Sequence, residues 1–167
     1  MKQILLINDD YLGHVDHVRH CGRGIVIKDG KVLLSYLSNN GYYMIPGGGF
    51  EEGESYAACC ERELLEETGI VVRAKEEIIE IEELFDVWRH FSHFFICEFV
   101  RDTGETHFTE AEEEAGYEKV WLSLEEAVNI FGKYEEYRMK DIPLYGLYRR
   151  EFTALTEVMN GKAEHLR

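Results

Sequence analysis

The spacing of apolar and polar residues predicts several strands with one helix between them and two helices near the end of the sequence. Apolar segments bounded by turn residues predict strands at residues 24–27, 31–34, 42–45, 71–81, 91–100 and 120–122. Asp29-Gly30 separates the first two segments, and this dipeptide is typical of a tight hairpin turn. The third segment runs directly into Pro46 and three glycines. Three short strands are therefore expected before the first helix.

Three segments have helical spacing and recognisable ends. The first covers about residues 55–68 and is expected to stop at Gly69, since glycine is typical just beyond a helix. Ser123 caps the second helix, where a glutamate three residues later completes a capping box. The third covers about residues 141–160, with apolar residues at helical intervals. Residues 101–116 are acidic and irregular, which predicts a surface loop.

The order of these elements indicates an α/β sandwich rather than an all-β fold or a helical bundle. A length of 167 residues suits one domain with a single hydrophobic core, so residues 1–167 are predicted to form one unit. Residues 1–20 are expected to supply an N-terminal strand or extension, with residues 3–8 as the candidate strand. No internal repeat or linker divides the sequence.

Composition and charge narrow the expected partners. Hydrophobic residues make up 45% of the chain and charged residues 31%, as in a soluble folded protein. The net charge of −15 repels nucleic-acid backbones and anionic membranes, so neither is an expected partner. No apolar run approaches the roughly 20 residues that span a bilayer, and a cytoplasmic location is expected. The four cysteines lack metal-site spacing and are expected to be buried or half-buried hydrophobic residues.

The first predicted helix concentrates negative charge. At 100° per residue, Glu63, Glu66 and Glu67 share an arc of roughly 100°, whereas the apolar residues lie on the other side. Like charges four residues apart destabilise a helix. Hard oxygen ligands for a divalent cation would explain that cost, because Mg²⁺ prefers carboxylates together with water and phosphate oxygens. The alternative is an acidic face that is simply solvated.

A longer pattern favours the metal-binding interpretation. The run from Gly48 to Ile70 resembles the Nudix box, GX₅EX₇REUXEEXGU, in which U is apolar. Its fixed positions in this chain are Gly48, Glu54, Arg62, Glu63, Glu66, Glu67 and Gly69. The flanking segments 44–49 and 121–127 are also similar to this family. The resemblance covers about residues 20 to 130.

The resemblance implies an α/β/α sandwich with a mixed sheet, in which the box forms a loop, a helix and a second loop. It implies that Mg²⁺, or Mn²⁺ in its place, is held by Glu63, Glu66, Glu67 and the backbone carbonyl of Gly47. It also implies that Arg62 orients the carboxylates. Three further box residues are expected to be structural: Gly48, Glu54 and Gly69.

The implied reaction is attack of water on phosphorus in the pyrophosphate bond of a nucleoside diphosphate linked to another group, which releases a nucleoside monophosphate. Glu63 is the first candidate for the general base. Some members of the family carry the base on a later loop, where Glu110, Glu112, Glu113 and Glu114 lie in this chain, and Glu114 and then Glu113 are the favoured candidates. Both could equally be solvated loop charges.

The substrate is less well defined than the reaction. Trp88 is a candidate for stacking on a base, and Tyr43 precedes the glycine turn. Arg19, Arg23 or Arg89 could contact phosphate. A nucleoside-triphosphate-like substrate is favoured. The alternatives are ADP-ribose or a nucleotide sugar, whose hydrolases are often homodimers with an added N-terminal strand, and a silent module that senses a nucleotide.

Overall fold

The computed structural model describes residues 1–165, with side chains through Gly161. The last two residues of the predicted single unit lie outside this part. The strands are β1 (Lys2–Ile7), β2 (His17–Lys28), β3 (Lys31–Leu37), β4 (Tyr42–Met44), β5 (Gly47–Gly49), β6 (Ile70–Phe85), β7 (Trp88–Asp102) and β8 (Tyr117–Ser123). The helices are α1 (Tyr56–Thr68), α2 (Glu110–Ala115), α3 (Leu124–Phe131) and α4 (Ile142–His165), with a short 3-10 helix at Tyr134–Tyr137.

The strands form a mixed sheet with the order β1-β6-β7-β2-β3-β4, and β5 and β8 pair with β2 and β3 respectively. Strand β1 runs parallel to β6, and β2 runs parallel to β7. The other pairs, including the long β6–β7 hairpin, are antiparallel. Strand β2 joins the two halves of the sheet, because its last two residues turn away from β7 to pair with β3.

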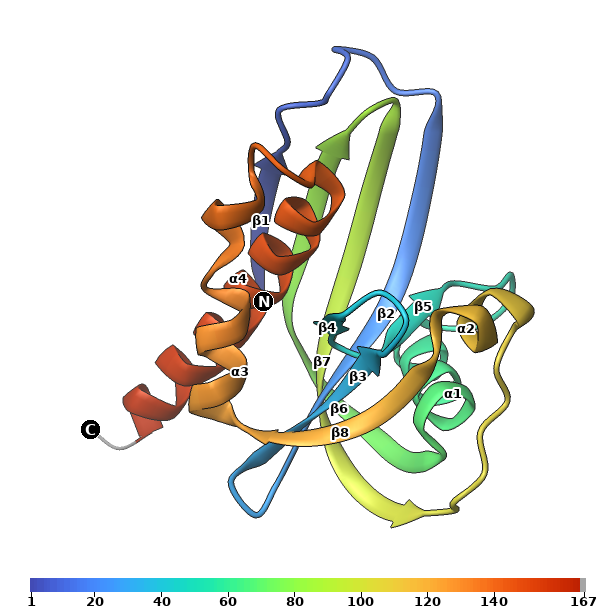
Figure 1. The fold of residues 1–167 in the computed structure, drawn as a ribbon. Helices are drawn as coiled ribbons and strands as arrows, with labels where there is room; N and C mark the ends of the chain where they lie inside the picture. Colours follow the sequence, from blue (N-terminus) through green and yellow to red (C-terminus); the bar gives the residue numbers. More distant parts are fainter. Residues whose placement is uncertain (166–167) are drawn as a thin grey trace.

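Helices cover both faces of the sheet, which gives an α/β/α sandwich (Figure 1). Helices α3 and α4 lie to the left of the sheet in this view, and α1 and α2 lie to the right. A large core packs α3 and α4 on one face, with Phe94 and Phe131 among its fully buried residues. A smaller core packs Cys60 and Leu64 of α1 on the other face. The predicted fold class is confirmed.

The predicted element types are largely confirmed, and their extents are corrected. The hairpin turn lies at Asp29-Gly30, and both long strands extend beyond the predicted limits because they pair with each other over most of their length. The prediction that residues 101–116 form only an irregular loop was wrong, since α2 lies within them. The Thr109 hydroxyl accepts a hydrogen bond from the Glu112 amide, and the Glu112 carboxylate accepts one from the Thr109 amide, which closes a capping box.

The four cysteines are buried and free, as predicted. Within residues 1–165, no helix is both long enough and apolar enough to cross a membrane.

Gly69 should be intolerant of a side chain. Its φ of 73° is left-handed, and a β-carbon would lie 2.7 Å from the carbonyl oxygen of Glu105. Gly69→Ala should therefore lower the free energy of unfolding by at least about 1 kcal/mol, measured by urea titration. Gly161→Ala is the control, because that helical glycine has no atom within 4 Å of the added carbon. The control should be neutral or stabilising by up to about 1 kcal/mol, and equal losses in both variants would contradict the prediction.

Candidate metal and phosphate site

Helix α1 is held close to the sheet by glycines of β2. Ser55 caps its first turn by accepting a hydrogen bond from the Ala58 amide at 3.0 Å. A β-carbon at Gly24 would lie 2.7 Å from a methyl group of Leu64, so a larger residue there would push the helix away. With Cys60 and Leu64 fully buried against the sheet, the acidic side of α1 faces strand β5.

Two carboxylates of the helix lie against the glycine strand β5. The Gly47 amide donates a hydrogen bond to Glu67 Oε2 at 3.2 Å, and a β-carbon at Gly48 would overlap the Glu63 carboxylate. Only 4% of the Glu67 surface is exposed, whereas Leu65, which the helical pattern placed on the core side, is 37% exposed. The box helix therefore buries an acid and exposes an apolar residue, because β5 covers the acidic side.

Arg62 binds the surrounding acids together. Its guanidinium donates two hydrogen bonds to Glu54, at 2.8 and 3.0 Å, and one to the Gly49 carbonyl at 3.0 Å. It also reaches Glu63 Oε1 at 3.0 Å and Glu66 Oε2 at 3.3 Å. The hydrogen bonds from Arg62 lower the pKa of Glu54 to about 2. Glu54 thus anchors Arg62, and Arg62 connects the helix to the glycine strand.

The site holds more negative charge than Arg62 neutralises. Burial raises the pKa of Glu63, although the hydrogen bond from Arg62 opposes this. Burial also raises the pKa of Glu67 well above its usual range, and the nearby charges of Glu63 and Glu112 raise it further. A cation at this position would favour the charged carboxylates and so oppose both shifts.

Carboxylate oxygens are suitable ligands for a hard divalent cation, but these carboxylates do not converge on one point in this structure. In the described part of the chain, no three acidic, histidine or cysteine side chains form a set arranged to chelate one ion. Glu63 and Glu66 do not converge because both carboxylates contact the Arg62 guanidinium. Binding a metal would require these two side chains to turn from Arg62 toward the ion. The oxygen donors fit Mg²⁺ or Mn²⁺.

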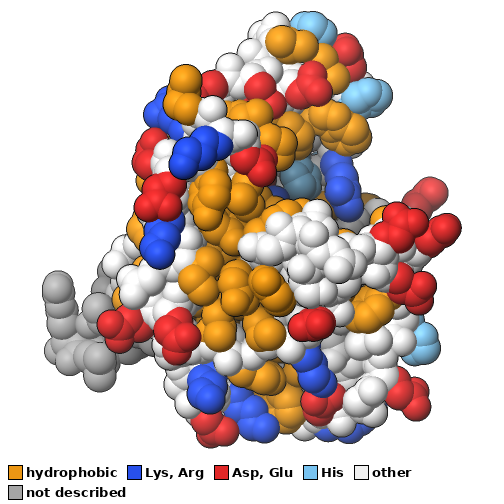
Figure 2. Space-filling view, in the orientation of Figure 1, with side chains coloured by type: hydrophobic (Ala, Val, Ile, Leu, Met, Phe, Trp, Pro, Cys, Tyr) orange, Lys and Arg blue, Asp and Glu red, His pale blue; other side chains and the backbone are white. Residues whose placement is uncertain are grey.

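A cavity of about 380 Å³ lies over these acids. Besides box residues, its lining includes Arg19, Arg23, Met44, Thr109, Glu112 and Tyr117. Acidic side chains gather along the right edge of the space-filling view, where Figure 1 places α1, α2 and β5 (Figure 2). The cavity therefore has an acidic floor and two arginines on its wall.

The structure assembles some predicted site residues and separates others. Arg23 and the helix acids Glu63, Glu66 and Glu67 line the cavity. Glu114 is exposed outside it, and its backbone carbonyl accepts a hydrogen bond from Asn39. The expectation that Glu114 faces the site is corrected, because the helical turn of α2 directs Glu112 inward instead. Sequence reasoning included Glu112 among the acids of residues 110–114 but ranked Glu114 and Glu113 ahead of it. The Thr109-x-x-Glu112 capping signature could have shown that these residues begin a helix.

The two predicted aromatic contacts also lie outside the cavity lining. Tyr43 packs on Tyr36, with ring centroids 4.6 Å apart. Trp88 packs on His17 at 4.7 Å, close to the turn between β6 and β7. Neither aromatic side chain reaches the acidic floor.

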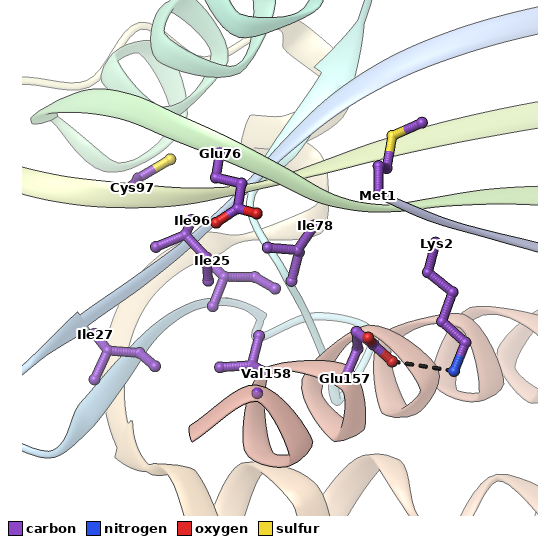
Figure 3. A pocket seen from close by; sticks show the side chains of 11 residues that line it. Met1, Lys2, Ile25, Ile27, Glu76, Ile78, Ile96, Cys97, Glu157 and Val158 are labelled. Atoms are coloured by element: carbon purple, nitrogen blue, oxygen red, sulfur yellow. Dashed lines mark hydrogen bonds and ion pairs between the residues drawn. The ribbon is translucent and has the colours of Figure 1, made fainter. Parts of the chain in front are cut away.

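A larger cavity lies elsewhere and has different chemistry. It occupies about 670 Å³ between the sheet and α4, and Figure 3 shows its apolar walls, with Ile25, Ile96 and Val158 among them. The ion pair between Lys2 and Glu157, at 3.2 Å, lies on one side. Its described lining lacks the combination of clustered acids, glycine backbone and arginines, so the smaller cavity is the candidate site.

Fold and site together define the class: an α/β/α sandwich whose glycine strand meets a helix carrying an arginine and three glutamates. The NUDIX domain family matches residues 18–142, which is most of the sequence. The chain belongs to this family.

Known proteins agree on the family. Nudix hydrolase 5 of Arabidopsis thaliana is 32% identical over 114 residues, which is 65% of this chain and 37% of that protein. The ADP-ribose pyrophosphatase of Methanocaldococcus jannaschii is 42% identical over 55 residues, or 31% of this chain and 32% of that protein. The chain thus spans about a third of the length of these curated relatives. A solved NUDIX hydrolase from Nitrosomonas europaea shares the fold, with a TM-score of 0.60, 20% identity, and coverage of 81% and 88% of the two chains.

Proposed function

We propose that this protein is a Mg²⁺-dependent hydrolase that cleaves the pyrophosphate bond of a nucleoside diphosphate linked to another group, releasing a nucleoside monophosphate. The observation that carries the proposal is the placement of two helix acids against the glycine strand: Glu67 is buried, Glu63 is half-buried, and both lie beside the backbone of Gly47 and Gly48. Mn²⁺ could take the place of Mg²⁺. A bound cation would supply charge to stabilise phosphate oxygens and would acidify a water molecule.

The arginines on the cavity wall support a phosphate-bearing substrate. Arg23 is 4% exposed and donates through Nε to Ser92 at 3.1 Å, while its Nη1 has no partner among the described residues. Arg19 is exposed beside Gly49 and lines the same cavity. These two guanidinium groups and a cation on the acidic floor would hold an anionic pyrophosphate from opposite sides.

Glu112 is the proposed proton acceptor in place of Glu114. It lines the cavity next to Glu67 and is held at the start of α2 by the Thr109 capping box. Glu63 is the alternative, and its carboxylate accepts a hydrogen bond from Arg62 at 3.0 Å. A carboxylate on a short capped helix is placed to take a proton from water over the acidic floor.

Two observations strengthen the ADP-ribose or nucleotide-sugar alternative relative to a triphosphate-like substrate. The relative from M. jannaschii is named an ADP-ribose pyrophosphatase. In addition, β1 forms an N-terminal strand beside β6, as expected for that group of enzymes. Homodimerisation remains a prediction.

The test is a panel of nucleoside triphosphates, nucleotide sugars, ADP-ribose and dinucleoside polyphosphates, incubated with Mg²⁺ or Mn²⁺ and separated by chromatography. We expect cleavage to a nucleoside monophosphate that requires the metal.

Glu67→Gln should abolish turnover and weaken Mn²⁺ binding measured by calorimetry, while Glu113→Gln, at an exposed position, should behave as wild type. Nucleotide binding without turnover by the wild type would favour the sensor instead.

The choice of base can be tested with a matched pair on α2. Glu112→Gln should lower kcat by about 100-fold or more if the carboxylate accepts a proton, whereas Glu114→Gln should leave kcat near the wild-type value. Both substitutions keep the side-chain size. A larger loss in Glu114→Gln would reinstate the residue that the sequence favoured.

Trp88 remains a prediction as the contact for the base. It lies on the same sheet face as Arg19, on the neighbouring strand, with a backbone separation of roughly 8 Å from ordinary strand spacing and rise. A nucleotide whose phosphate meets Arg19 could therefore stack on Trp88. Trp88→Ala should raise KM by about fivefold or more, while Val18→Ala, on the opposite face, should not change it. An unchanged KM in Trp88→Ala would exclude this contact.

A further inference from the structure

Helix α4 covers the outer edge of strand β4 with side-chain acceptors. The Tyr43 amide donates a hydrogen bond to the Tyr148 hydroxyl at 3.1 Å, and the Ile45 amide donates one to Glu151 Oε2 at 2.5 Å. Strand β4 is the last in the sheet order, so these amides face the side where it has no strand partner. Tyr148 and Glu151 are three residues apart and share one face of α4. The helix thus supplies the acceptors that a neighbouring strand would otherwise provide.

The Glu151 carboxylate is fixed from its other side. It is fully buried, and its Oε1 accepts a hydrogen bond from Arg150 Nε at 2.7 Å. Arg150 also contacts Glu83 of β6 at 3.3 Å, and both of these residues are buried. A buried carboxylate that accepts from both an amide and a guanidinium has little freedom to move. Through Arg150 and Glu151, α4 ties β6 to the end of β4.

The end of β4 leads directly into the candidate site. Residue Ile45 is followed by Pro46, whose carbonyl accepts from the Gly24 amide at 3.0 Å. The next residue is Gly47, whose amide donates to Glu67 at 3.2 Å. Three consecutive residues are therefore held by α4, β2 and α1 in turn. A shift at Ile45 would be passed to Gly47 over only two peptide units.

We propose that Glu151, assisted by Tyr148, is a positioning residue that sets the location of the Gly47 turn relative to Glu67. Glu151 acts through the Ile45 amide and does not line the cavity over the acids. The consequence for metal binding rests on the proposed function, whereas the position of the turn does not.

The test compares Glu151→Leu, which removes both hydrogen bonds, with Glu151→Gln, whose carbonyl oxygen can still accept from Ile45. Leu155→Ala is the control, because Leu155 is a fully buried residue of α4 whose apolar side chain supplies no acceptor to β4. Amide exchange at Ile45 and Gly47, thermal melting, Mn²⁺ affinity and kcat are measured for each. If Glu151→Leu does not fold, Tyr148→Phe, which removes one acceptor, replaces it.

Glu151→Leu should speed exchange at Gly47 and weaken Mn²⁺ binding by about tenfold or more, with Glu151→Gln closer to wild type. Leu155→Ala should lower the melting temperature without either change. The proposal is overturned if Glu151→Leu exchanges at Gly47 no faster than Leu155→Ala. If exchange responds as expected but the wild type neither binds Mn²⁺ nor hydrolyses any substrate, the positioning role stands and the proposed function fails.

Discussion

The close contact between α1 and the glycines of β2 and β5 is the constraint on which the rest of the site depends. A side chain at Gly24 would lift the helix from the sheet, and one at Gly48 would displace the Glu63 carboxylate. Because the helix lies so close, Glu67 is taken out of water and meets a backbone amide instead of solvent. The contact places Glu67 in a buried position and Glu63 in a half-buried one, both beside the backbone of the glycine strand.

Concentrating these acids is unfavourable without compensation, and the chain compensates only in part. Arg62 contacts Glu54, Glu63 and Glu66, but Glu67 has only a backbone amide as its donor. Burial and mutual repulsion then favour the protonated acid at Glu63 and Glu67. A site built in this way is stabilised by any cation that enters it. Such a conflict between charge placement and local stability is common where charged groups converge to bind a ligand, which agrees with the proposed metal site.

The second layer of helices has a separate part in this arrangement. Helix α4 packs its apolar side into the larger core. Its buried polar residues contact groups on both halves of the sheet: Glu151 accepts from the Ile45 amide, and Arg150 contacts the Glu83 carboxylate. Glu151 is as deeply buried as the core residues around it, yet its carboxylate accepts a hydrogen bond from the Ile45 amide, just before the glycine turn. The two faces of the sandwich therefore meet at one turn, which Glu67 contacts from one side and Glu151 restrains from the other.

The order of elements in the sequence predicted the α/β class, and local spacing predicted the limits of α1. The acids at the site were identified by the resemblance of residues 48–70 to the Nudix box, because their spacing alone also fits a solvated helix face. That Glu112 rather than Glu114 faces the cavity could be seen only in the folded structure, since it depends on how the short helix α2 docks. The tertiary structure also decided that Trp88 and Tyr43 lie away from the acids, and that Glu151 reaches the Ile45 amide, 106 residues apart in sequence. Spacing along a helix or strand predicts which residues share a face. It does not predict what that face meets, because contacts between distant segments depend on how the elements pack.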